Sequence, residues 1–376
     1  MNKRALLIDA DLLDNGTRHP NLALMKISGY LKKKGYEVKL LTDYNNLSHS
    51  DYDEIYISKV FTFTNYPPIL DSIPDEKKQK GGTGFFPDGN SEDLKDEIEH
   101  HMPDYNLYDE YIDIKTKSGR SKKYFSDYLD YSIGFTTRGC FRKCPFCVNK
   151  KYDKVIRHSP VSEFLDPDRK RIYLWDDNIL AYEKWYEIFD ELNQTGKPFQ
   201  FRQGLDIRLL TKEKAKVLAN SKYWGDIIFA FDNIDEKDHI IRKLELWKKY
   251  SDRQTKFFLL TGYYRQDEKD IEETFERIKI LMHYQCLPYI MRHENYLNSE
   301  FRSLYIQLAR WCNQPNIFKK MSFRQFCEAN QKYHEKAKNN KKTLCSSYDV
   351  MVKFEEAFPS IAKKYFDIRY GSGGEL

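Results

Sequence analysis

Short strand-like and helix-like segments alternate along residues 131–293, and this alternation constrains the fold more than any other feature of the sequence. Apolar runs typical of buried strands lie at 132–137, 171–176, 199–203, 226–231, 256–261 and 287–292. Helical patterns fill most of the gaps, at about 181–193, 211–220, 235–249 and 267–284. Strands joined by helical crossovers pair in parallel, so the pattern predicts either an open parallel sheet or an incomplete barrel.

The segments on either side of this pattern predict two further domains. An open Rossmann-like α/β domain with connecting loops is indicated by strands expected at 4–9, 37–42 and 55–62. A helical C-terminal domain is indicated by helices expected at about 299–312, 321–338 and 346–364. We therefore predict domain boundaries that give 1–130, 131–295 and 296–376.

Composition and charge narrow the class of protein. No apolar run approaches the roughly 20 residues of a membrane helix, and an odd count of 7 Cys argues against a disulfide framework. We therefore expect a soluble, cytoplasmic protein that does not contact a membrane. Residues 296–376 hold 14 Lys and Arg against 8 Asp and Glu. This excess indicates either a solvated helical face or an anionic partner such as nucleic acid or a nucleotide, bound through Lys332, Lys336, Lys338, Lys341 and Lys342.

Three cysteines follow the first strand of the central segment within eight residues. Cys140, Cys144 and Cys147 have the spacing Cys-x3-Cys-x2-Cys. Three thiolates can hold three irons of a cubane cluster and leave the fourth iron open, as a reactive centre requires. A zinc site completed by His158 is the alternative, but its spacing is not that of common zinc ribbons or fingers. Merely structural cysteines are disfavoured because neighbouring cations such as Arg142 favour thiolates.

This loop, with the aromatic Phe146 before its last cysteine, resembles the cluster-binding loop of the radical S-adenosylmethionine (AdoMet) superfamily over about 131–295. The resemblance implies a partial (β/α)6 TIM-like barrel and a [4Fe–4S] cluster held by Cys140, Cys144 and Cys147. It also implies that AdoMet binds the open iron and is cleaved reductively to a 5′-deoxyadenosyl radical. A reducing partner such as flavodoxin or ferredoxin would supply the electron.

The resemblance also suggests roles for polar residues at the other strand ends, where barrel active sites form. Asp176 or Asp177 could meet the methionine amino group, although a helix-capping role for Asp177 or Asn178 is the alternative. Further candidates for cofactor or substrate contacts, of which the last two could bind the ribose, are Gln203, Asp206, Arg208, Asp232 and Asn233.

Two residues near the last strand ends are candidates for moving a proton. Tyr263 follows the fifth strand and His293 follows the sixth. A partly buried, hydrogen-bonded histidine without catalytic function is the plainer interpretation of His293. No side chain needs to act as a nucleophile, because the chemistry would start by homolysis.

The N-terminal segment resembles the cobalamin-binding-like domain of one large branch of the superfamily. His19-Pro20-Asn21 and Gly81-Gly82-Thr83-Gly84 carry this likeness, and for the glycines a plain turn is favoured over a phosphate cradle. The Asp-x-His-x-x-Gly motif that supplies a cobalt ligand is missing, since Asp11-Leu12-Leu13-Asp14 contains no histidine. Cobalamin is therefore possible, but we do not expect it on these residues alone.

Four cysteines lie outside the loop. Cys286 precedes the sixth strand, and Cys312, Cys327 and Cys345 lie on the expected C-terminal helices. Their wide spacing favours buried apolar thiols over an auxiliary cluster.

Three functions are compatible with these features. The main hypothesis is a radical AdoMet enzyme acting on an unidentified substrate, with nucleic acid or a nucleotide favoured by the basic C-terminal segment. A cobalamin-dependent radical AdoMet methyltransferase acting on a small molecule or peptide is the alternative. A non-catalytic iron–sulfur sensor or adaptor is a third, which the polar strand ends disfavour.

Overall fold

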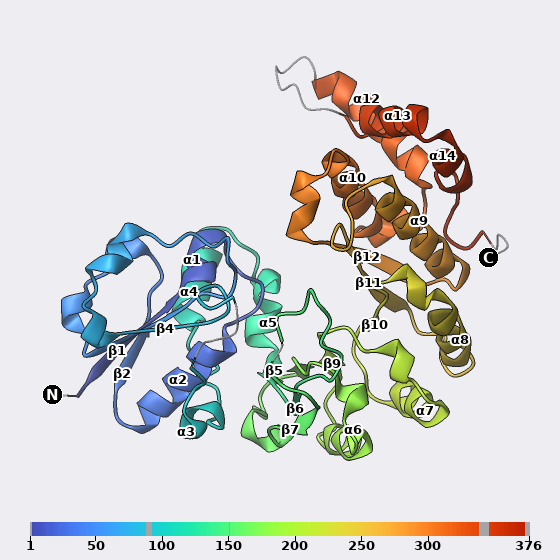
Figure 1. The fold of residues 1–376 in the computed structure, drawn as a ribbon. Coiled ribbons are helices and arrows are strands. Elements are labelled where there is room, and N and C mark those ends of the chain that lie inside the picture. The colour runs from blue at the N-terminus through green and yellow to red at the C-terminus, as the bar shows by residue number, and fades with distance from the viewer. Residues whose placement is uncertain (1, 88–91, 150, 338–345, 373–376) are drawn as a thin grey trace. The chain divides into compact units, whose positions relative to one another are not determined.

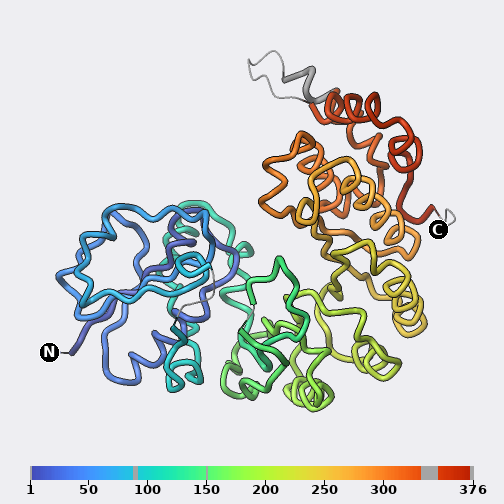
Figure 2. The backbone as a smooth tube through the Cα atoms, viewed as in Figure 1, coloured from blue at the N-terminus to red at the C-terminus, as the bar shows by residue number. Residues whose placement is uncertain are grey.

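The chain divides into two compact units in the computed structural model, Met1–Arg202 and Gln203–Leu376. The structure describes residues 2–87, 92–149, 151–337 and 346–372. Each unit is an α/β assembly built on parallel strands, and Figure 2 traces the chain through both. The predicted boundaries at 130/131 and 295/296 fall inside these units, so the domain division predicted from the sequence stays a prediction.

The first unit begins with a four-stranded parallel sheet in the order β2-β1-β3-β4 (Figure 1). Its strands are β1 (Arg4–Asp9), β2 (Glu37–Leu40), β3 (Glu54–Ser58) and β4 (Lys78–Gly81). Strand β1 is apolar without alternation because both of its faces are buried. Ala5 and Leu7 pack with the helix α2 (Leu22–Lys33), whereas Leu6 and Ile8 pack with Leu70 on the opposite face.

A second parallel sheet in this unit has the order β5-β8-β9, from Tyr131–Gly134, Arg171–Leu174 and Phe199–Phe201. Helix α6 (Trp185–Gln194) connects its last two strands. Beyond β5, the short antiparallel pair β6 (Thr137–Arg138) and β7 (Ile156–Arg157) brackets the cysteine loop. The loop is thereby closed at its base by backbone hydrogen bonds.

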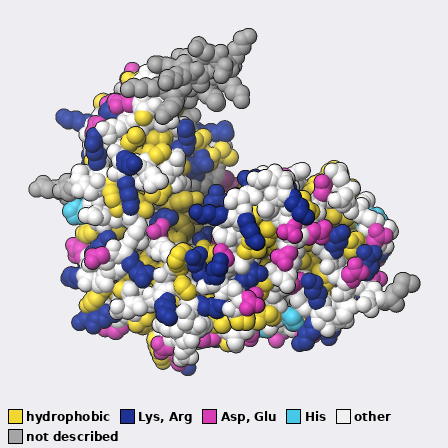
Figure 3. Space-filling model, turned by 180° about the vertical axis from the view of Figure 1, so that it is seen from behind, with side chains coloured by type: hydrophobic (Ala, Val, Ile, Leu, Met, Phe, Trp, Pro, Cys, Tyr) yellow, Lys and Arg dark blue, Asp and Glu magenta, His cyan; other side chains and the backbone are white. Residues whose placement is uncertain are grey.

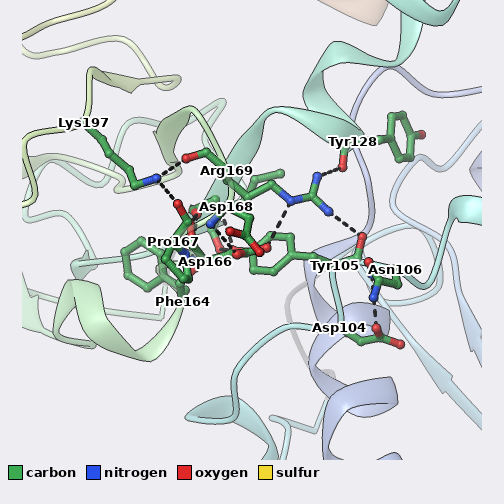
Figure 4. A network of polar contacts seen from close by, with 12 residues as sticks. Asp104, Tyr105, Asn106, Tyr128, Phe164, Asp166, Pro167, Asp168, Arg169 and Lys197 are labelled. Carbon is green, nitrogen blue, oxygen red and sulfur yellow. Dashed lines mark hydrogen bonds and ion pairs between the residues drawn. The ribbon is translucent and has the colours of Figure 1, made fainter.

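A buried cation, Arg169, links the segment before β8 to the segment before β5 (Figure 4). It is 7% exposed and donates to the carbonyl oxygens of Tyr105 and Tyr128, which lie in the segment before β5. The Tyr105 hydroxyl donates to the Phe164 carbonyl at 2.6 Å and accepts from the Ile133 amide at 2.8 Å. Segments 1–130 and 131–202 therefore share one buried polar network.

The second unit contains the parallel sheet β10-β11-β12, from Ile227–Ala230, Thr255–Thr261 and Leu287–Arg292. Helices α7 (Lys212–Asn220), α8 (Lys237–Lys248) and α9 (Glu268–His283) lie between or beside these strands. Phe229, Phe257 and Trp247 form the aromatic contact between the sheet and α8, with ring centroids 5.5–5.7 Å apart. All six strands and four helices expected in the central segment are present. They form two separate parallel sheets of three strands, and the partial barrel stays a prediction.

The C-terminal part of the second unit is helical, as expected. It contains α10 (Arg302–Cys312), α11 (Pro315–Phe318), α12 (Phe323–Ala337), α13 (Ser347–Ala357) and α14 (Pro359–Tyr365). These helices pack on α9 through Phe275, whose ring contacts Phe323, Tyr365 and Phe366. Among the described residues, none of the helices has the length and apolar character that a membrane crossing requires.

The structure differs from the predicted elements in some local details. The helix expected at 346–364 is two helices, because Pro359 cannot continue the hydrogen bonding of α13. Directly after β1 lies helix α1 (Ala10–Asn15), which was not among the predicted elements and which Asp9 caps by accepting from the Leu12 amide. The segment between β3 and β5, predicted as connecting loops, also contains β4 and the helices α3 (Asp96–Glu99), α4 (Asp109–Lys117) and α5 (Ser126–Leu129).

Candidate active site

The cysteine loop begins with a turn that only glycine tolerates well. Gly139 has φ +97°, and a Cβ atom there would lie 2.4 Å from the Lys154 carbonyl oxygen. Lys143, inside the loop, also has a positive φ of 48° and pairs with Asp153 at 2.7 Å. This ion pair lowers the pKa of the Asp153 carboxyl. The loop is thus bent by local backbone geometry and by charges at its rim.

The loop directs hydrogen-bond donors at its sulfur atoms. The Arg142 amide lies 3.4 Å from Cys140 Sγ, and the Asn149 amide lies 3.4 Å from Cys147 Sγ. Cys140, Cys144 and Cys147 are all partly exposed. Donors next to a sulfur stabilise its thiolate form, which is the form that binds iron. The donor set therefore suits a thiolate-ligated cluster.

The three loop sulfurs are not gathered as a site for one ion. Within the described ranges, no group of three or more His, Cys, Asp and Glu side chains is placed to hold a single metal ion. The zinc ligand considered for the sequence, His158, instead contacts Glu99 at 3.2 Å and Ser159 at 2.9 Å. In a cubane cluster each thiolate binds a different iron, so the ligands need not converge on one point.

Outside the loop, the described cysteines are buried thiols. Cys286, Cys312 and Cys327 are at most 1% exposed, and burial raises the pKa of each, for Cys286 to about 12. This agrees with the prediction of apolar thiols. Cys345 lies outside the described residues.

The segment after β8 runs beside the cysteine loop and binds it residue by residue. Trp175 continues the strand pairing, with its amide 3.0 Å from the Gly134 carbonyl oxygen. Asp177 then accepts from the Gly139 amide at 2.7 Å, and Asn178 Nδ2 lies 3.4 Å from Cys140 Sγ. Neither makes a capping bond in the short helix that follows, so the capping alternative is not what the structure shows.

Asp176 is the buried centre of this contact. It is 2% exposed and accepts four hydrogen bonds, from the amide and hydroxyl groups of Thr136 and Thr137, at 2.5–3.1 Å. Burial raises the pKa of its carboxyl, and the four donors oppose that increase. Both carboxylate oxygens are used within the unit. The structure thus places Asp176 behind the loop as a support, whereas the sequence suggested contact with AdoMet.

After β9, the predicted contact residues Asp206 and Arg208 belong to an ion-pair network. Arg208 Nε lies 2.6 Å from Asp206 Oδ1, and a second nitrogen pairs with Glu236. Both carboxylates raise the pKa of Arg208, although burial opposes them. Gln203 is exposed at the start of the second unit. The guanidinium of Arg208 is therefore already neutralised by protein groups.

After β10, Asp232 and Asn233 lie at the edge of a cavity of about 250 Å³ in the second unit. Asp232 accepts from the Leu260 amide at 3.1 Å, and burial raises the pKa of its carboxyl. Asn233 caps a short helix by accepting from the Asp235 amide at 3.0 Å. Behind them, buried Arg277 on α9 donates to the carbonyl oxygens of residues 231, 232 and 260, each at 3.0 Å.

Tyr263 and His293 lie side by side, with ring centroids 4.7 Å apart at 83°. The His293 amide bonds the Thr261 carbonyl oxygen, and its Nδ1 accepts from the Asn295 amide at 3.3 Å. Accepting at Nδ1 leaves the proton on Nε2 of the neutral ring. The two candidates for proton transfer are therefore neighbours, and a catalytic role for either stays a prediction.

At the carboxyl ends of the strands of the N-terminal sheet, Asp11 holds the apolar loop that follows β3 in place. Its carboxylate accepts from the amides of Val60 and Phe61 and from the Thr64 hydroxyl, at 2.5–3.2 Å. Val60, Phe61 and Phe63 are 42%, 47% and 76% exposed, and the two phenylalanine rings are stacked 5.1 Å apart. The strand ends of open α/β sheets are where ligands bind. This loop offers a ligand an apolar surface there.

The nearby glycines serve the backbone itself. Gly82 has φ +100°, and a Cβ atom there would lie 2.3 Å from the Lys59 carbonyl oxygen. The predicted turn therefore agrees with the structure. His19 pairs with Asp127 through Nδ1 and contacts Arg202 through Nε2, so both of its ring nitrogens are in use.

Several supporting residues were not identified from the sequence. Thr136 and Thr137 offered a signal, since two adjacent hydroxyl residues directly precede the loop. Arg277 gave a weaker sequence signal: it is a charged residue on the buried face of α9, close to Thr274 and Ile278.

Comparison with solved structures shows the same fold in a radical AdoMet methyltransferase. The structure of TsrM from Kitasatospora setae, with cobalamin and a [4Fe–4S] cluster bound, has a TM-score of 0.51 and 12% identity, covering 78% of this chain and 75% of that one. The structure of the same protein with tryptophan substrate and the AdoMet analogue aza-SAM has a TM-score of 0.51 and 12% identity, over 77% and 73%.

Comparisons at the level of sequence found no match. No protein-family model matches the chain. No curated protein matches it either. The radical AdoMet resemblance seen in the sequence is thus confirmed as a likeness of fold. The expectation against cobalamin is not supported, because the structure of similar fold has cobalamin bound.

Proposed function

We propose that this protein is a radical AdoMet enzyme whose cluster is held by Cys140, Cys144 and Cys147. The observation that carries the proposal is the pairing of the segment after β8 with the cysteine loop, which fixes a donor-lined thiolate loop at the ends of parallel strands. A [4Fe–4S] cluster, when bound, supplies the electron that cleaves AdoMet, and a flavodoxin- or ferredoxin-like partner would reduce it.

The protein's own groups position and shield the reactants. Asn178 is buried next to Cys140, with its Nδ2 at 3.4 Å from the sulfur, and so helps to hold the loop in place. Asp232 and Asn233 remain candidates for ribose contacts, and Tyr263 with His293 for moving a proton at the substrate. Gln203, Asp206 and Arg208 would support this edge of the site.

For the reaction, we favour methyl transfer to a small molecule or peptide with cobalamin as a second cofactor. The apolar loop at the end of β3 suits a ligand with a broad apolar face, and the methyltransferase fold extends over 78% of this chain. With no histidine in residues 11–14 and both nitrogens of His19 in use, this region would not supply cobalt with an imidazole ligand.

The nucleic-acid hypothesis has less support from the described residues. Arg324 is bound by Glu355 and Asp367, and Lys364 lies within 4 Å of Glu272 and Glu276. Basic and acidic side chains are interspersed on the face shown in Figure 3. Of the lysines named above, Lys338, Lys341 and Lys342 lie outside the described residues, as do the side chains of Lys332 and Lys336.

The test is anaerobic reconstitution with iron and sulfide, followed by dithionite and AdoMet. Wild-type protein should bind iron and sulfide in equal amounts and consume AdoMet, whereas Cys144→Ala should do neither. Cys312→Ala, which removes a buried thiol outside the loop, is the matched control and should behave as wild type. Equal cluster content in wild type and Cys144→Ala would refute the assignment.

Cobalamin is tested separately, by its absorbance after gel filtration of protein incubated with it. Wild type should retain cobalamin, and the double variant Phe61→Ser/Phe63→Ser should lose it. Ile114→Ser, which alters an exposed apolar side chain on α4, is the control. If wild type retains none, the methyl-transfer part fails and the radical AdoMet assignment stands.

A further inference from the structure

The side chain of Asn178 touches a cluster ligand directly. Asn178 is 4% exposed, and its Nδ2 lies 3.4 Å from Cys140 Sγ. It occupies the N-cap position of the helix Ile179–Ala181 but makes no capping hydrogen bond. The usual reason for an asparagine at a helix start is therefore missing here.

The chemistry of the two groups fixes which amide atom faces the sulfur. A thiolate only accepts hydrogen bonds, so the amide nitrogen must point at it and the amide oxygen away. Oδ1 accordingly has no hydrogen-bond partner, although it is buried. Because the amide is not tied into another polar network, the contact with Cys140 is what the side chain provides.

A hydrogen bond to a ligating sulfur changes the electron affinity of a cluster. The donor withdraws negative charge from the sulfur and so stabilises the reduced, more negatively charged state. We propose that Asn178 is a positioning residue that orients the Cys140 thiolate and raises the reduction potential of the cluster. The proposal rests on the proposed function, since it requires a cluster on this loop.

The two residues before Asn178 hold its backbone in a fixed position beside the loop. Asp176 and Asp177 anchor the preceding two positions to Thr136, Thr137 and Gly139, so the backbone leading into Asn178 is fixed against the loop. Two further donors to the loop sulfurs are backbone amides, of Arg142 and Asn149. Those amides survive any side-chain substitution, whereas the Asn178 donor does not.

The experiment is a redox titration of the reconstituted cluster followed by electron paramagnetic resonance, without AdoMet. Asn178→Leu keeps the size of the side chain and removes the donor, so its potential should be more negative than that of wild type. We expect at least a tenfold lower ratio of reduced to oxidised cluster at a fixed potential, or about 59 mV for one electron. Asn149→Leu, on the same loop, keeps its backbone donor and should titrate as wild type.

Asn178→Asp provides a second variant of nearly the same shape. Its carboxylate cannot donate and adds negative charge, so its potential should be lower still. Loaded variants with the wild-type potential would overturn the inference and leave the proposed function intact, as would equal shifts in Asn178→Leu and Asn149→Leu. Failure of wild type to bind any cluster would overturn the proposed function itself.

Discussion

The two units of this protein stabilise the ends of their parallel strands by different chemistry. In the first unit, Asp9 and Asp176 are each 2% exposed and accept hydrogen bonds from neutral amide and hydroxyl groups. In the second unit, the strand ends around Asp232 are held by a buried cation, Arg277. Burial raises the pKa of all three carboxyl groups.

The two arrangements hold different parts of the chain in place. Asp176 collects its donors from one loop, so it fixes the loop that carries the cysteines. Arg277 collects carbonyl oxygens from two adjacent strand ends, so it fixes the strands to each other. One arrangement positions a loop, and the other closes a sheet edge.

Removing the cation should have the largest effect on stability. Arg277→Met leaves three carbonyl oxygens, one buried and two partly buried, without this donor, and we expect the second unit to lose about 4 kcal/mol. Hydrogen exchange of the β10 and β11 amides measures this loss locally. Arg242→Met, at an exposed site on α8, is the control. Unchanged protection of both strands would show that Arg277 does not hold them.

Removing the carboxylate in the first unit should have the next largest effect. Asp176→Ala leaves two amides and two hydroxyl groups of the loop base unpaired, for an expected loss of about 3 kcal/mol and of most cluster binding. Asp177→Ala loses the acceptor of only the Gly139 amide, or about 1 kcal/mol. Urea unfolding and iron content measure both. Equal losses in the two variants would contradict a central role for Asp176.

The remaining effect depends on pH and concerns the buried carboxyl of Asp9. Burial raises the pKa of Asp9 to about 6, so its protonated form is favoured in the folded state. The protonated carboxyl of Asp9 contributes its full stabilisation below about pH 4. This stabilisation is lost as the pH rises through 6, and the total loss in the free energy of unfolding is about 3 kcal/mol. Asp9→Asn should therefore match wild type near pH 4 and exceed it at pH 7. Asp14→Asn, at an exposed site, should show no such difference; parallel curves for Asp9→Asn would refute the assignment.

Much of the strand and helix order could be predicted from the sequence, because strands buried on both faces, such as Arg4–Asp9, are continuous apolar runs. The cysteine spacing likewise predicted the candidate site proposed above, at Cys140, Cys144 and Cys147. Helix α1 was missed because its capping residue, Asp9, also ends a strand, and a single residue can serve both elements.

The partners of the polar strand-end residues could not be predicted. Asp176 and Asp177 were expected to face a ligand, but they bind the cysteine loop through contacts about 40 residues apart in the chain. Arg208 has the shape to bind the carboxylate of a ligand, but in the structure it binds two carboxylates of the protein, those of Asp206 and Glu236. A sequence indicates the chemistry of a side chain, whereas pairing depends on which loops the fold brings together.

Arg169 has a consequence for how this protein can be divided. A fragment that begins at residue 131 would keep this guanidinium but lose the carbonyl oxygens of Tyr105 and Tyr128 that accept its hydrogen bonds. A fragment that ends at residue 130 would keep the carbonyls without the cation. An exchange of the N-terminal sheet for that of another protein would therefore have to place two backbone carbonyl oxygens against Arg169. A chain cut at residue 130 would therefore lose these two buried hydrogen bonds on both sides of the cut.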